Sequence, residues 1–87
     1  MPIDNIIPSK HRNDHPMIPL GLYRHYKGRY YQVIGVATHS ETEEHLVVYR
    51  ALYGDFGLWV RPLTLFREQV EHGGQRVFRF TFVEKDL

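Results

Sequence analysis

Short runs in which hydrophobic and polar residues alternate, separated by glycine turns, fill the chain after residue 19. Such alternation is typical of β-strands that have one apolar face. The clearest run places Phe78, Phe80 and Phe82 on one face of a strand, with Arg79 and Thr81 on the other. The whole pattern predicts strands over residues 20–26, 30–38, 46–53, 58–61 and 77–83. Five short strands at this spacing favour a mainly β fold, as a small barrel or a half-open sheet.

Glycines mark the turns between these strands, at Gly28, Gly54, Gly57, Gly73 and Gly74. Gly35 lies inside the longest run, which indicates a β-bulge or a sharp bend. Apolar residues at positions 63, 66 and 70 have a helical spacing, and Pro62 precedes them. This segment therefore predicts one or two helical turns opened by the proline.

Residues 1–19 differ from the rest of the chain. They hold four of the five prolines and show neither a strand period nor a helix period. Because proline fixes φ and lacks a backbone donor, we expect an extended or partly disordered arm over 1–19 and one domain over 20–87. Ile6, Ile7, Met17 and Ile18 are candidates to pack onto this domain or onto a second subunit.

Composition restricts the compartment and the class of partner. The chain has no cysteine and no apolar run near the roughly 20 residues of a membrane helix, so we expect a cytoplasmic protein without membrane association. The chain has eleven basic and ten acidic residues, and its pI is about 8.1. Domains that hold nucleic acid through phosphates usually have a pI above about 9, so this pI does not favour a strong non-specific nucleic-acid binder. Eight of the eleven basic residues are arginine, which suits recognition of a discrete anion.

Aromatic residues beside arginine and histidine form the leading candidate site. Tyr and Trp next to Arg can stack and make cation–π contacts, and these residue types dominate binding hot spots. The sequence therefore predicts a module that binds a peptide, a protein or a small anionic ligand through Tyr23, His25, Tyr53, Trp59 and Arg61. The alternative is a structural role for the same side chains in a rigid barrel wall. Glu68 is a candidate ion-pair partner for Arg61 or Arg50.

A polar cluster over residues 39–42 supports a second hypothesis, a small hydrolase or a nucleotide-handling enzyme. Its candidate catalytic residues are His25, His39, Ser40 and Glu41. Ser40 would be the nucleophile, with His25 or His45 as its base and Glu41 or Asp55 as the orienting carboxylate. Neither a nucleophile elbow nor a glycine-rich phosphate loop surrounds Ser40. Hydroxyls that stabilise the loop are the simpler interpretation, so binding is favoured over catalysis.

Metal binding and nucleic-acid binding are weaker alternatives. His25, His39, His45 and Glu41 could supply metal ligands, but histidines six residues apart across a loop match no ligand spacing. We therefore expect neither a metal nor a cofactor. A nucleic-acid module would use Arg24, Lys27 and Arg29 on phosphates and tyrosines on bases. Nothing in the pattern specifies an oligomeric state.

Several motifs in order carry a resemblance to a known family. They are Gly21-x-Tyr23-Arg24-His25-Tyr26-Lys27-Gly28, Tyr31-x-Val33, His39-Ser40-Glu41-Thr42, Val47-Val48-Tyr49, Leu52-Tyr53-Gly54, Trp59-Val60-Arg61-Pro62 and Phe66-x-Glu68-x-Val70. The chain from Gly21 to about Phe82 resembles a family of small bacterial domains of unknown function. That resemblance implies an SH3-type barrel and a bacterial source, and it implies no reaction, ligand or partner.

Overall fold

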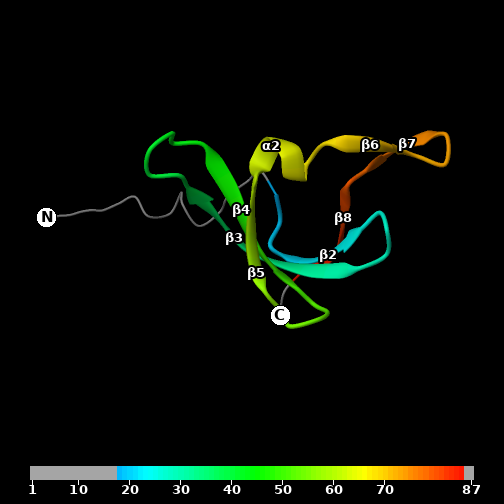
Figure 1. Cartoon of the computed structure of the whole chain (residues 1–87), viewed down its shortest axis with the longest axis horizontal. Coiled ribbons are helices and arrows are strands. Elements are labelled where there is room, and N and C mark those ends of the chain that lie inside the picture. The colour runs from blue at the N-terminus through cyan, green and yellow to red at the C-terminus, as the bar shows by residue number, and fades with distance from the viewer. Residues whose placement is uncertain (1–17, 86–87) are drawn as a thin grey trace, which may run out of the picture.

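The structure is a computed structural model that describes residues 18–85, and within this range it has seven strands and one helical turn (Figure 1). Five strands form one antiparallel sheet in the order β5-β4-β3-β2-β8, and β6 and β7 form a separate hairpin. The sheet strands are β2 (Gly21–His25), β3 (Tyr30–Thr38), β4 (His45–Ala51), β5 (Leu58–Pro62) and β8 (Phe80–Lys85). The other elements are α2 (Leu63–Phe66), β6 (Gln69–His72) and β7 (Gln75–Phe78). The predicted mainly β fold with one short helical turn is confirmed.

Neighbours in sequence pair in the sheet, and the last strand returns to the first. β2, β3, β4 and β5 pair in succession, and β8 pairs with β2. Over residues 18–85, β5 and β8 are therefore the two edges of the sheet. The turn between β2 and β3 needs Gly28, whose φ of 108° lies in a region that residues with a side chain rarely adopt.

The interruption at Gly35 is a β-bulge, as the sequence predicts. The register between β3 and β4 shifts between Val33 and Gly35, so Ile34 is the additional residue. A bulge bends its strand and increases the local twist. The two halves of the longest strand can therefore follow the curvature of the sheet.

The segment after Pro62 differs from the prediction in two ways. The helix ends at Phe66 and does not reach Val70. The predicted strand over 77–83 is divided at Arg79 into β7 and β8. Phe78 therefore pairs in the hairpin, while the next two phenylalanines of the run belong to the sheet.

The cause of both differences is the turn at Gly73-Gly74. The two glycines have φ values of 62° and 79°, and a type I′ turn requires positive φ at both central positions. This turn folds the flanking residues into the β6–β7 hairpin, which projects to one side of the sheet (Figure 1). At the base of the hairpin, the N–H of Arg79 donates to the carbonyl of Glu68 at 3.0 Å, and their side chains form an ion pair.

The hydrophobic core lies between α2 and one face of the sheet, called here the core face. Its buried residues are Ile18, Tyr23, Val33, Val47, Tyr49, Leu63, Phe66 and Phe80. Phe66 is 1% exposed and stacks on Phe80 with 4.1 Å between ring centroids. Its ring also meets the edges of Tyr23 and Tyr49, each at 5.4 Å. One side chain of α2 thus contacts three strands.

Ile18 is part of this core, although it falls in the arm predicted from the sequence. The hydroxyl of Tyr23 donates to the carbonyl of Pro19 at 2.7 Å, which attaches this stretch to β2. Residues 1–17, the rest of the predicted arm, lie outside the described residues. Over residues 18–85, no helix has the length and apolar character needed to span a membrane.

Replacement of Phe66 tests how far the core depends on this one ring. We expect Phe66→Ala to lower the free energy of unfolding by about 3–5 kcal/mol, the usual cost of removing a buried phenylalanine ring. Such a loss approaches the whole stability of many small domains. Chemical denaturation followed by circular dichroism measures it.

Leu65→Ala is the matched control, because Leu65 is on the same helical turn and is 44% exposed. We expect this variant to lose less than about 1 kcal/mol, since exposed substitutions rarely cost more. Equal losses in the two variants would show that helix propensity, and not the packing of Phe66, stabilises this segment.

Candidate functional site

Four of the five predicted ligand-binding residues project from the core face of the sheet. Toward the β8 edge of the sheet, Tyr23 is paired with Phe82 and His25 is paired with Phe80. Toward the β5 edge, Trp59 and Arg61 are paired with the buried residues Tyr49 and Val47. Residues directly opposite each other in neighbouring strands share a face. The fifth predicted residue, Tyr53, follows the end of β4.

Three of these residues meet around Tyr31 and Phe80. The His25 ring lies 5.0 Å from the Phe80 ring and 6.2 Å from the Tyr31 ring, between centroids. The hydroxyls of Tyr53 and Tyr31 are hydrogen-bonded at 2.7 Å. The guanidinium carbon of Arg61 lies 5.9 Å from the centre of the Phe80 ring. Together with Arg29, these residues form what we call the aromatic–arginine cluster: His25, Arg29, Tyr31, Tyr53, Arg61 and Phe80.

The two arginines of the cluster are held by aromatic side chains. Arg61 donates its Nε–H to the hydroxyl of Tyr49 at 3.3 Å. The guanidinium carbon of Arg29 lies 4.2 Å from the centre of the Tyr53 ring, a cation–π contact. Both arginines therefore keep N–H donors that these contacts do not use.

The ion pair expected between Glu68 and Arg61 or Arg50 is not formed. Glu68 pairs with Arg79 instead, because both residues stand at the base of the β6–β7 hairpin. Within residues 18–85, Arg29 and Arg61 have no carboxylate in ion-pair contact. The positive charge of the cluster is thus not neutralised by this part of the chain.

His25 is held in its neutral form. Burial lowers its pKa, and the positive charges of Arg79, Lys27 and Arg61 lower the pKa further. Its Nδ1 accepts the backbone N–H of Lys27 at 3.1 Å. A neutral imidazole that accepts at Nδ1 carries its proton on Nε2, so His25 presents an N–H donor on its other side.

Tyr31 is the polar centre of the cluster and remains a neutral phenol. Burial, followed by the hydrogen bond to Tyr53, raises its pKa to about 12. Its ring also meets Tyr49 and Phe80 at right-angled contacts of 5.5 Å. The hydroxyl pair of Tyr31 and Tyr53 can therefore donate one hydrogen bond outward and accept others at neutral pH.

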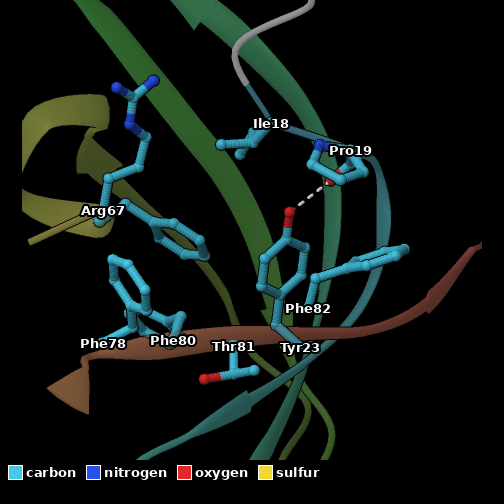
Figure 2. A pocket seen from close by; sticks show the side chains of 9 residues that line it. Ile18, Pro19, Tyr23, Arg67, Phe78, Phe80, Thr81 and Phe82 are labelled. Atoms are coloured by element: carbon cyan, nitrogen blue, oxygen red, sulfur yellow. Dashed lines mark hydrogen bonds between the residues drawn. The ribbon is translucent and has the colours of Figure 1, made fainter.

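Tyr23 is paired with Tyr31 of the cluster, and its side chain lines an apolar groove of about 530 Å³ that also includes Phe80 (Figure 2). The groove is lined by Ile18, Pro19, Tyr23, Phe66, Arg67, Phe78, Phe80, Thr81 and Phe82. Figure 2 shows the Tyr23 ring beside Phe82, with its hydroxyl directed at Pro19. Burial raises the pKa of Tyr23 to about 12. Its hydroxyl donates to the Pro19 carbonyl, and its ring packs against Phe66 and Phe82.

Trp59 lies at the border of the cluster. It is opposite Tyr49 on the edge strand β5, and its side chain is 58% exposed. The structure therefore brings His25, Tyr53 and Arg61 together around Tyr31 and Phe80, and Trp59 precedes Arg61 by two residues on the same strand.

The structure separates His25 from the other catalytic candidates, while His39, Ser40 and Glu41 lie in the one loop between Thr38 and His45. His25 lies near the first residue of β3, where its backbone N–H donates to the carbonyl of Arg29. Residues 39–41 follow the last residue of the same strand. A nine-residue strand at about 3.3 Å per residue places these ends roughly 25 Å apart. The His39 Nδ1 accepts the backbone N–H groups of Glu41 and Thr42, at 3.1 and 3.3 Å. The loop thus uses its polar groups to hold its own conformation.

The remaining candidate ligands are also dispersed. Over residues 18–85, no three His, Asp or Glu side chains gather in a way that could hold a metal ion. Of the three basic residues proposed for nucleic acid, Arg24 projects to the opposite face from His25, and Arg29 lies on Tyr53. They do not form one continuous basic surface with Lys27.

Sequence reasoning missed Tyr31 and Phe80 as parts of the site. Tyr31 could have been found, because the short turn at Gly28 pairs it with Tyr23 on the same face. Phe80 could not, because its pairing with His25 joins residues 55 positions apart in the chain.

The lowered pKa of His25 predicts an effect of acid on stability. Its folded pKa lies below the usual value of 6.5, so the folded state binds fewer protons than the unfolded state. The stability that results is present above about pH 6.5 and is lost as the pH falls through the lowered pKa. We expect His25→Gln to flatten the loss of unfolding free energy below that pH, as measured by denaturation at a series of pH values. A wild-type slope in His25→Gln would contradict the assignment.

Comparisons with known proteins identify the family. The model of the DUF1653 family, proteins of unknown function, matches residues 21–82. The crystal structure of a protein of that family from Bordetella bronchiseptica is similar, with 38% sequence identity and a TM-score of 0.73. The similarity covers 80% of this chain and 92% of that one. No curated protein matches the chain. The family match begins at β2 and ends within β8, so the chain belongs to the DUF1653 family.

Proposed function

We propose that this chain is a binding module whose aromatic–arginine cluster holds an anionic group of a peptide, a protein or a small ligand. The observation that carries the proposal is that the Arg61 guanidinium is held in place but not paired with a carboxylate. Its guanidinium is half-buried, is oriented by the hydroxyl of Tyr49, and has no carboxylate in ion-pair contact within residues 18–85. A fixed guanidinium with unused N–H groups is suited to a carboxylate or a phosphate.

The electrostatics of the cluster support an anionic ligand. The charges that lower the pKa of His25 are all positive, and they come from β5, from the turn after β2 and from Arg79. Positive charges that disfavour a proton on histidine favour an anion in the same place. His25 and the Tyr31–Tyr53 pair would add neutral donors, which bind an anion without competing for a proton.

The aromatic side chains around Arg61 would supply contact area. Tyr53 belongs to the cluster, and Trp59 lies two residues before Arg61 on β5 with its side chain 58% exposed. Rings held on strands lose little conformational entropy when a ligand packs on them, which is why Tyr and Trp are enriched in hot spots. Arg61 would therefore orient the ligand, and the rings would bury its apolar part.

We further propose that the module is an SH3-type barrel. The strand order supports this: four strands pair in succession, a helical turn follows, and the last strand returns to the first. Aromatic grooves of SH3 domains commonly bind extended peptides. A shared fold does not by itself imply a shared ligand, and the contacts of Arg61 do not depend on the type of barrel.

Arg61→Gln tests the proposed function. The probes are sulfate and a tetraglutamate peptide with blocked ends, titrated into the full chain while backbone amide and imidazole shifts are followed by NMR. We expect saturable shifts at His25, Tyr53 and Arg61, and a rise in the pKa of His25 when the anion binds. In Arg61→Gln we expect affinity to fall by about tenfold or more, because a charge-assisted hydrogen bond is lost. Arg61→Lys should lie between the two, since lysine keeps the charge and loses the fork.

Arg76→Gln is the matched control, because Arg76 is exposed on the β6–β7 hairpin and bonds Gln69. It should bind both probes as the wild type does. The proposal fails if neither probe gives saturable shifts at the cluster, or if Arg61→Gln and Arg76→Gln respond alike.

A further inference from the structure

The outer edge of β5 is a second surface with unusual properties. Leu58, Trp59 and Val60 are consecutive, and their side chains are 55%, 58% and 58% exposed. No charged residue interrupts them, and within residues 18–85 β5 is the last strand on its side of the sheet. Three exposed apolar residues on an unpaired edge are what water-soluble sheets usually avoid.

The register shows which backbone groups of this edge are free. The N–H of Ala51 donates to the carbonyl of Gly57 at 3.0 Å, so these two opposed residues form a hydrogen-bonded pair. Such pairs alternate along an antiparallel ladder. Trp59 and Arg61 therefore direct their backbone groups toward β4, and Leu58 and Val60 direct theirs away from the sheet.

The position of Pro62 agrees with this alternation. Leu58, Val60 and Pro62 are every second residue of β5, so the nitrogen of Pro62 also points away from β4. Proline occurs on edge strands at positions where its missing N–H would have faced solvent. The outward donors and acceptors of β5 are thus those of Leu58 and Val60, and within residues 18–85 no hydrogen bond satisfies them.

The other edges in the described residues carry a bulge or charged residues along the strand, whereas β5 has such features only at its end, in Arg61 and Pro62. β8 has a register shift against β2 and ends in the exposed charged residues Glu84 and Lys85. The β6–β7 hairpin is short, and its exposed positions include Glu71 and Arg76. Bulges, charges and short length are the usual means of preventing strand addition.

We propose that β5 pairs in antiparallel fashion with β5 of a second copy of this chain. The two-fold axis passes at Trp59, so that Leu58 of each copy lies opposite Val60 of the other. Each Leu58–Val60 pair exchanges two backbone hydrogen bonds, which uses the outward groups of both residues on both copies. The two sheets become one continuous sheet.

The side chains of β5 are self-complementary in this register. Trp59 lies opposite Trp59 of the second copy in a non-hydrogen-bonded pair, the type that brings side chains closest. Leu58 and Val60 meet on the other face of the sheet. Arg61 lies opposite Gly57 of the second copy, so like charges are not placed against each other. A two-fold contact of one surface with itself is the commonest form of association between identical chains.

This inference does not rest on the proposed function, because it uses the backbone of Leu58 and Val60 and not the arginines of the cluster. The experiment is sedimentation equilibrium of the full chain over a wide range of concentration. We expect the mass to rise from that of one 10.4 kDa chain to twice that value as the concentration increases. Trp59 is the only tryptophan, so we also expect an exciton signal in circular dichroism that disappears on dilution.

Two substitutions at Val60 test the pairing. We expect Val60→Lys to abolish the dimer and the exciton signal while the fold is retained, because the side chain is exposed and lysine blocks edges. Val60→Pro removes only a backbone N–H that points away from β4, and it should also abolish the dimer. Val83→Lys is the matched control on the opposite edge, and it should remain dimeric. A monomer at every concentration, or a dimer that survives both changes at Val60, would overturn the proposal.

Discussion

The stack of Phe66 on Phe80 is the contact on which the rest of the structure depends. The two rings are nearly parallel and 4.1 Å apart, and they join the single helical turn to the last strand of the sheet. One side of Phe80 is thus part of the core. The same ring makes T-shaped contacts with His25 and Tyr31 and lies under the guanidinium of Arg61, so the candidate site is assembled on it. In a domain this small, the core and the site share side chains because too few residues exist to separate them.

Arg79 explains how Phe80 reaches that position. Its backbone accepts the N–H of Tyr26 and donates to the carbonyl of Glu68, and its guanidinium pairs with the carboxylate of Glu68. The chain therefore changes partner at Arg79, from the hairpin to the sheet. The same guanidinium contributes to the lowered pKa of His25. The residue that separates hairpin from sheet therefore also helps to keep the site positive.

The strands and turns were predictable from the sequence because their signals are local. Alternation and glycine placement located the strands near Tyr30–Thr38 and Leu58–Pro62, and the bulge at Gly35. The partner of Glu68 and the neighbours of His25 depend on how β8 returns to β2, and no local pattern encodes that pairing. The sequence thus identified His25, Tyr53 and Arg61 as candidates by residue type, while their convergence depends on Phe80 and Tyr31. The catalytic candidates are divided in the same way, since the length of β3 separates His25 from His39, Ser40 and Glu41.

β5 combines two roles through the two-residue period of a strand. Trp59 and Arg61 bond β4 through their backbone, and their side chains project from the core face, where Arg61 joins the cluster. Leu58 and Val60 alternate with these two residues, so their backbone groups point away from β4. A strand added at this edge need not displace Arg61 from Tyr49. Because opposed residues of paired strands share a face, pairing of two copies would place both clusters on the same side of one continuous sheet. Two sites on one face of a dimer would favour a ligand with two anionic groups over a ligand with one, through the raised effective concentration of the second contact.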